Sequence, residues 1–244
     1  MAVVVIALFG VALLGFGVEG AIGFGGTVIV ASIGAQLLPL DELLPAFVPI
    51  NMVLSAWLVA TGWRAIAWRI LFVEVAPIVA VGAAVGLALF HVPAKTALAL
   101  AFGVFVVGLA TLQLARPSQA DLVMPVRIAM LVLGGIVHGL FGTGGPMIVY
   151  VVRRRVVDKR TFRASLAVLW LTLNVALLVN FASLDLYRRE TLDLGLAIAL
   201  AVVPGLIIGE RVHRALDTAR FERVVWLGLL GAGAALAIRS GFAL

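Results

Sequence analysis

The chain contains no cysteine among its 244 residues and only three histidines. The absence of cysteine excludes disulfides, thiolate metal sites and cysteine nucleophiles. Three histidines are too few to favour a histidine-based metal cluster, so the sequence predicts neither a metal site nor a cofactor. Charge is scarce as well, because Asp, Glu, Lys and Arg make up 12% of the residues, about half their usual share in soluble domains.

Apolar residues dominate instead. They account for 64% of the chain, and the mean hydropathy is +1.20. This composition predicts an all-α polytopic membrane protein that is embedded in the lipid bilayer. The formal charge of +6 would favour a nucleic-acid partner in a soluble protein. Here the basic residues lie in short loops between apolar runs, where they set membrane orientation, so no nucleic-acid partner is predicted.

A glycine-rich phrase occurs twice, with an ionisable residue at its head each time. Residues 19–27 read EGAIGFGGT, and residues 138–146 read HGLFGTGGP. An offset of 119 residues superposes four glycines and continues through Ile29/Ile148 and Val30/Val149. The chain is therefore predicted to consist of two similar halves, and such a duplication in an apolar chain is typical of transporters.

Eight apolar runs follow one another along the chain. Six have the length of one helical crossing of a hydrocarbon core about 30 Å thick: residues 43–61, 70–90, 95–115, 162–184, 190–209 and 221–241. The other two, residues 2–38 and 124–152, carry the glycine-rich phrases and are too long for one crossing. Because glycine is a poor helix former, each is predicted to be a hairpin of two short half-helices joined by an unwound turn.

Loop charge sets the topology. We place the basic boundary Trp63–Arg69 on the cytoplasmic side. The densest basic loop, residues 153–163, then also faces the cytoplasm only if the hairpin 124–152 enters and leaves the membrane on the same side. Each half then contains a hairpin and three crossings, an odd number that inverts the second half relative to the first. The sequence predicts inverted repeats at 1–118 and 119–244 within one membrane domain, with both termini in the periplasm.

These paired phrases, in about 240 apolar residues, resemble the sulfite exporter TauE/SafE family, also called the toluene sulfonate uptake permeases. The resemblance covers essentially the whole chain. It implies a bacterial cytoplasmic-membrane permease for sulfite, sulfonates or related small anions, coupled to the proton gradient. Two features depart from the expected pattern: Pro146 stands where the first phrase has Thr27, and Glu19 and His138 are ionisable.

An unwound turn at membrane depth is tolerated only where protein buries it or where it lines a cavity. Its free N–H groups and the start of the following half-helix form an anion site without a basic side chain. The sequence therefore predicts a substrate site at the two turns, made of Gly23, Gly25, Gly26, Thr27, Gly142, Thr143, Gly144 and Gly145. The alternative is that these glycines only permit close helix packing.

Glu19 and His138 occupy equivalent places in the two phrases. A charge at the bilayer centre costs at least roughly 2.5–3.5 kcal/mol, so both are functional hypotheses. If the hairpin tips meet, the two side chains pair, and the histidine takes up a proton as the substrate binds. The alternative is a neutral hydrogen-bonded pair that locks the halves together.

Further polar residues interrupt the apolar spans. Buried amides and hydroxyls seek partners, so they either line the cavity or bond one helix to another, and cavity lining is slightly favoured. These residues are Asn51, Ser55, Thr172 and Asn174. The tryptophans are predicted to serve as interface or packing residues instead: Trp57, Trp63, Trp68, Trp170 and Trp226.

The sequence as a whole predicts a secondary transporter that moves a small anion by alternating access around a midplane site, with protons as the coupling ion. Two alternatives from other classes stay open. One is a non-transporting membrane subunit of a larger complex, and the other is an intramembrane enzyme that uses Glu19 and His138. A homodimer is one of the assemblies that the sequence leaves open.

Overall fold

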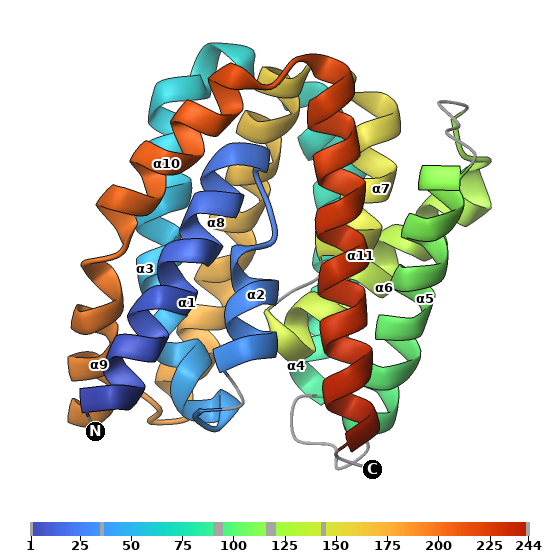
Figure 1. Ribbon diagram of the computed structural model, residues 1–244. Coiled ribbons are helices and arrows are strands. Elements are labelled where there is room, and N and C mark those ends of the chain that lie inside the picture. The colour runs from blue at the N-terminus through green and yellow to red at the C-terminus, as the bar shows by residue number, and fades with distance from the viewer. Residues whose placement is uncertain (1, 35–36, 90–94, 116–120, 143–144, 243–244) are drawn as a thin grey trace.

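The computed structural model describes residues 2–34, 37–89, 95–115, 121–142 and 145–242, and every regular element within these ranges is a helix. The predicted all-α fold class is confirmed (Figure 1). In chain order the helices are α1 (Ala2–Ile22), α2 (Gly26–Ile33), α3 (Leu40–Gly62), a 3-10 turn (Trp63–Ala65), a π-helix (Ile70–Val75), α4 (Ala76–Ala88), α5 (Lys95–Ala115), α6 (Met124–Phe141), α7 (Gly145–Arg155), α8 (Lys159–Ser183), α9 (Arg189–Ala199), α10 (Val202–Ala215) and α11 (Thr218–Phe242).

Five helical segments of the described chain are long and apolar enough to cross a membrane. They are α1, α3 with its 3-10 turn, the π-helix with α4, α8 and α11. The bent pair α9 and α10 makes a sixth if it is counted as one span. The helix α5 has the same bounds as the predicted run 95–115.

The predicted crossing at 190–209 is not one continuous helix. The helix α9 ends at Ala199, α10 begins at Val202, and their axes differ by 40°. Pro204 explains the break, because its ring lacks an N–H group and clashes with the carbonyl of residue 200 in a continuous helix. Pro77 stands likewise near the start of α4, directly after the π-helix, so both spans are irregular just before a proline.

Both glycine-rich runs form hairpins, but their arms are unequal. In the first hairpin α1 has 21 residues and α2 has 8, and in the second α6 has 18 and α7 has 11. The prediction of two short half-helices is therefore wrong for α1, whereas α6 is one of the shorter apolar helices. The break in the first run falls after Ile22, and that leaves α1 long enough to be a full membrane span.

The two hairpins open in opposite directions (Figure 1). The hairpin of α1 and α2 opens towards the end of the molecule at which α1 begins and α11 ends. The hairpin of α6 and α7 opens towards the other end, where α8 and α11 begin and α10 ends. We call this the basic end, because arginines and lysines occupy the last turns of α7 and α10 and the start of α8.

The helices pack in four main pairs: α1 with α10, α6 with α4, α3 with α8, and α5 with α11. The first two pairs meet through glycines, which let backbones approach closely. In the α4–α6 pair these are Gly82, Gly86, Gly135 and Gly139, and in the α1–α10 pair they are Gly17, Gly20, Gly205 and Gly209.

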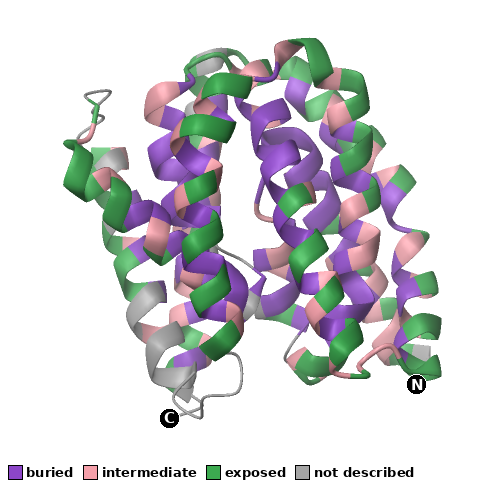
Figure 2. Ribbon diagram, turned by 180° about the vertical axis from the view of Figure 1, so that it is seen from behind, coloured by how far each residue is buried: buried purple, intermediate pink, exposed green. Residues whose placement is uncertain are grey.

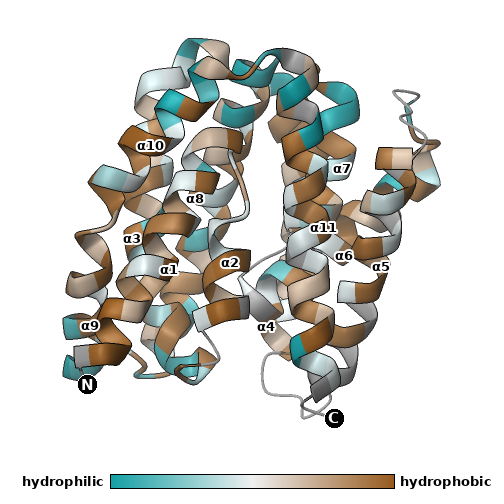
Figure 3. Ribbon diagram, in the orientation of Figure 1, coloured by the Kyte–Doolittle hydropathy of each residue, from teal (hydrophilic) through white to brown (hydrophobic). Residues whose placement is uncertain are grey.

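The outside of the helix bundle is apolar. Figure 2 shows buried residues turned towards the interior, and Figure 3 shows hydrophobic residues on the flanks with polar residues gathered near the ends. Leu196, Leu200 and Val203 are 64–72% exposed on one flank. Such a surface matches the lipid environment that the composition predicts.

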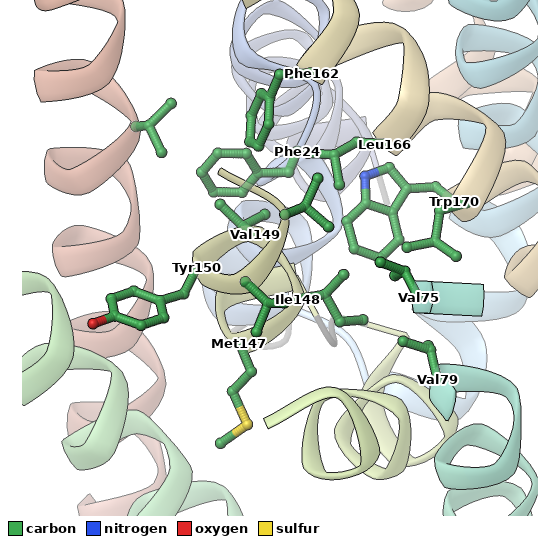
Figure 4. Packing of buried hydrophobic residues seen from close by; sticks show 14 of the residues in the cluster. Phe24, Val75, Val79, Met147, Ile148, Val149, Tyr150, Phe162, Leu166 and Trp170 are labelled. Carbon is green, nitrogen blue, oxygen red and sulfur yellow. The ribbon is translucent and has the colours of Figure 1, made fainter. Parts of the chain in front are cut away.

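The short helix α7 lies in the core. Every residue from Gly145 to Arg153 is buried, and Met147, Ile148, Val149 and Tyr150 belong to one cluster with side chains from α4, α8 and the first hairpin (Figure 4). Gly142 and Gly145, the described residues on either side of the break before α7, are both buried in protein. This is the condition under which irregular backbone is tolerated at membrane depth.

The glycine seam between α4 and α6 leads to a stability prediction. A Cβ atom on Gly82 would lie 2.1 Å from the carbonyl oxygen of Val132. Because that oxygen belongs to the backbone, Gly82→Ala has to push α6 away, at a cost of about 1–3 kcal/mol. We expect the melting temperature in detergent to fall by roughly 3–10 °C.

Gly108→Ala in α5 is the matched control, because a Cβ atom there has nothing within 4 Å. Alanine is the better helix former, so this variant should melt at or slightly above the wild-type temperature. Equal melting temperatures for the two variants would contradict the close packing of α4 on α6.

Candidate functional site

Each hairpin turns at glycines whose backbone angles other residues rarely adopt. In the first turn φ is 87° at Gly23 and 99° at Gly25, and in the second turn φ is 65° at Gly142. Positive φ carries no steric penalty for glycine, which explains its use at these points. The predicted site residues Thr143 and Gly144 lie outside the described residues.

The tips of both hairpins border one small cavity, together with α3 and α8. About 20 Å³ of it is open to the centre of a water molecule, which is room for about one water. Its lining consists of Glu19, Phe24, Gly25, Thr27, Val28, Asn51, His138, Gly142, Gly145, Trp170 and Asn174. Eight of the predicted site residues are thus brought together from six helices and two turns.

Glu19 lies one turn before the end of α1 and is 3% exposed. Its carboxylate faces the side chain of Asn51 and the backbone N–H groups of Gly26 and Thr27 at the start of α2. The partial positive charge of a helix N-terminus stabilises a carboxylate in this position. The start of α2, where the sequence predicts an anion site, therefore already faces an acidic side chain of the protein itself.

His138 is its counterpart on α6 and is 2% exposed. The imidazole stacks on the indole of Trp170, with ring centroids 5.9 Å apart and planes 13° from parallel. Neither ring nitrogen has a hydrogen-bond partner among the described residues. Burying a polar group without a partner costs free energy, so this ring is a candidate for contact with a ligand.

The predicted direct pair of Glu19 and His138 is not formed. Both side chains line the cavity, but no hydrogen bond or ion pair joins them, because both nitrogens of His138 lack a partner within the described chain. The α2 N-terminus and Asn51 face Glu19 instead, and Trp170 covers His138. Any coupling between the two residues is therefore indirect.

The two asparagines join the helices that flank the cavity. Asn174 Nδ2 on α8 donates a hydrogen bond to Asn51 Oδ1 on α3 at 3.1 Å. Both asparagines also line the cavity. The two roles weighed for these amides, lining and helix-to-helix bonding, are therefore both present.

Four predicted residues lie differently. Thr172 is exposed on α8, and its hydroxyl donates to the carbonyl of Val168, so it does not line the cavity. Ser55 is fully buried but is not part of the lining. Gly26 packs against Glu19, and Gly23 packs against Arg163. Both glycines allow close packing at these points, and neither lines the cavity.

Trp170 is a functional candidate that the sequence assigned to packing. Its Nε1 donates a hydrogen bond to the carbonyl of Gly23 at 2.8 Å, and its ring lines the cavity. The available signal was its spacing, because Trp170 lies one helical turn before Asn174 and residues four apart share a face. Figure 4 shows this side chain projecting from α8 in the buried cluster.

Arg163 is a second residue that the sequence did not single out. Its Nη1 donates to the carbonyl of Gly20 near the end of α1 and to Glu210 Oε2 on α10, both at 2.8 Å. His213 Nδ1 lies 2.8 Å from the carbonyl oxygen of Ala21, to which it donates. The last carbonyl groups of an α-helix lack hydrogen-bond donors within the helix. For α1, Arg163 of α8 and His213 of α10 provide these donors from the basic end.

Comparisons with known proteins agree with this architecture. The family model described as "Sulfite exporter TauE/SafE" matches residues 7–236. The "Probable inner membrane transporter protein TsaS" of Comamonas testosteroni is 25% identical over 178 residues, which are 72% of this chain and 74% of that protein. No solved structure matches the chain.

Proposed function

The chain belongs to the sulfite exporter TauE/SafE family of membrane transporters, and on this premise we propose that it carries a small sulfur-containing or organic anion through the cavity between its hairpin tips. The observation that carries the proposal is the buried imidazole of His138, which lines that cavity and has no hydrogen-bond partner for either nitrogen among the residues that the structure describes. A neutral imidazole offers one N–H donor and an imidazolium offers two. The start of α2 adds the N–H groups of Gly26 and Thr27.

We propose alternating access between two inverted repeats. Three observations support it. The hairpins open in opposite directions. When the two halves are exchanged, the α1–α10 pair becomes the α6–α4 pair, and the same exchange leaves the α3–α8 and α5–α11 pairs unchanged. The cavity holds about one water (20 Å³), so a sulfur oxyanion enters only when the tips move apart. In this scheme the basic end faces the cytoplasm and both termini face the periplasm.

Glu19 provides the coupling to protons in this proposal. Its carboxylate faces the N–H groups that a substrate anion would use. An arriving anion takes over these donors when Glu19 is protonated, so one proton enters the site with one negative charge. The net charge of the buried site stays unchanged, which avoids the cost of an extra charge at membrane depth.

Anion binding by the purified protein tests the proposal. Sulfite, sulfate, thiosulfate, sulfonates and carboxylates are compared by thermal shift, since a ligand at 100 times its Kd stabilises by about 2.7 kcal/mol. Flux of the best anion is then measured in proteoliposomes that contain this protein alone. A non-transporting subunit would show no flux, and an intramembrane enzyme would form product without a gradient.

A pair of identical substitutions locates the site. Thr27→Val removes the hydroxyl of a residue that lines the cavity, and we expect it to weaken anion binding about tenfold, the equivalent of one hydrogen bond. Thr172→Val removes a hydroxyl on the exposed face of α8 and should leave the affinity unchanged. Equal losses in both variants, read by thermal-shift titration, would place the anion elsewhere.

A further inference from the structure

Two hollows lie side by side between α3 and α10 near the basic end. The first, which we call the basic pocket, has a volume of about 480 Å³ and also borders the start of α8. The second, which we call the apolar groove, has a volume of about 370 Å³. Both are lined by Trp57, Glu210 and Arg214, so they form one continuous depression with a charged part and an apolar part.

The basic pocket carries an excess of positive charge. Four of its lining residues are Lys159, Arg160, Arg163 and Arg214, against the single carboxylate of Glu210. Lys159 and Arg163 are engaged, because they donate to the carbonyls of His213 and Gly20. Arg160 is exposed, and Arg214 bonds Glu210 through Nε at 2.9 Å while its side chain stays 78% exposed. These two guanidinium groups are placed to receive an anion from outside.

The apolar groove faces the surroundings of the protein. Its walls include Trp57, Val203 and Ile207, which are 57%, 64% and 48% exposed. Figure 3 shows hydrophobic residues along α10. A small water-soluble anion gains nothing from such walls, whereas an acyl chain does, at about 0.8 kcal/mol for each buried CH₂ group.

We propose that an anionic phospholipid occupies this depression, with its phosphate against Arg160 and Arg214 and one acyl chain in the apolar groove. The charged part lies at the end of the helices and the apolar part along their flank, which matches the order of headgroup and chain in a bilayer leaflet. Trp57 lies where the two parts meet, the depth at which tryptophan is favoured. Basic pockets between membrane helices bind anionic headgroups by the same electrostatics.

The site adjoins the contacts that hold the first hairpin. Glu210 lines both hollows and accepts a hydrogen bond from Arg163, which also donates to Gly20. A phosphate bound at Arg214 therefore lies beside the carboxylate that Arg214 and Arg163 share. The proposal of a lipid site rests on the lining of the two hollows. It does not depend on which anion the protein transports.

The test uses the full-length protein in nanodiscs of phosphatidylcholine with increasing amounts of phosphatidylglycerol. Retention of phosphatidylglycerol is read by native mass spectrometry, and stabilisation is read by thermal shift. We expect the double variant Arg160→Gln/Arg214→Gln to bind phosphatidylglycerol about 30-fold more weakly, at about fivefold for each charge near the membrane surface. Ile207→Trp, which fills the groove without changing charge, should also lower retention.

Arg64→Gln/Arg69→Gln is the matched control, because both arginines are exposed near the same boundary and line neither hollow. It should retain phosphatidylglycerol as the wild type does. Equal losses in the two double variants would show unspecific attraction and overturn the proposal. Stabilisation by inorganic phosphate alone that equals the effect of phosphatidylglycerol would make this a free-anion site and overturn it as well.

Discussion

Replacing Arg163 with glutamine is expected to open the cavity towards the basic end of the protein. Because the chain contains no cysteine, a single Val28→Cys substitution places one reporter thiol in the cavity lining. Val28 is 6% exposed, so this thiol should react slowly with an impermeant maleimide in inside-out vesicles. We expect Arg163→Gln to raise the labelling rate about tenfold.

The physical reason is the set of bonds at the end of α1. The Arg163 side chain is 11% exposed and joins Gly20 to Glu210. A hydrogen bond to a charged group contributes about 1.5–3 kcal/mol, and 1.4 kcal/mol is a tenfold change in population. Because Glu210 is 39% exposed, solvent weakens the pair, and the lower end of that range applies.

Arg214→Gln is the control for Arg163→Gln. It removes the same charge and the 2.9 Å bond to the same carboxylate, but Arg214 makes no hydrogen bond to α1 among those described. Its labelling rate should equal that of the parent Val28→Cys protein. If Arg163→Gln labels at the parent rate too, the contacts of Arg163 do not close this end of the cavity.

The helical architecture could be predicted because apolar length and glycine content are local properties of the sequence. The predicted runs 43–61, 162–184 and 221–241 lie within α3, α8 and α11, apart from the last residue of the second. The bend before Pro204 was missed, although a proline in an apolar run is a local signal for it. Hydropathy alone does not register a missing N–H group.

The site could be predicted only in part, because a repeated phrase identifies residues and does not show which way they face. Glu19, His138 and the glycines of the turns were found from the repeat itself. Thr172 and Asn174 differ by two positions, and in a helix that spacing puts them on different faces. The role of Arg163 depends on a contact with Gly20, 143 residues away in sequence, which no local pattern contains.

Glu19→Gln is expected to separate anion movement from proton movement. Glutamine keeps the shape of the side chain that faces Asn51 and the start of α2, but it carries no charge and takes up no proton. In proteoliposomes an inward proton gradient should drive anion uptake by the wild type and should have no effect on the variant. Exchange of labelled for unlabelled anion should continue. Glu42→Gln, at an exposed position in the first turn of α3, should behave as the wild type.

His138→Phe tests the other side of the cavity. Phenylalanine keeps a ring to stack on Trp170 and removes two buried nitrogens that lack partners in the described structure. Removal of unpartnered polar groups does not cost stability, so the melting temperature of the ligand-free variant should stay the same or rise. Anion binding should be lost. A lower melting temperature with normal binding would assign His138 a purely structural role.

The double variant Glu19→Gln/His138→Phe then shows how the two residues communicate. No bond joins them in the described structure, because the nitrogens of His138 have no partner there. The interaction energy in the stability of the ligand-free protein should therefore stay at the low end of the range for residues that share a cavity, about 0.5 kcal/mol. The effects on transport should not add, because both residues act on one anion in one cavity. The double variant should be no less active than His138→Phe alone. An interaction energy of about 2–3 kcal/mol without ligand would instead restore a direct pair. Additive losses of transport would show that the two residues serve separate steps.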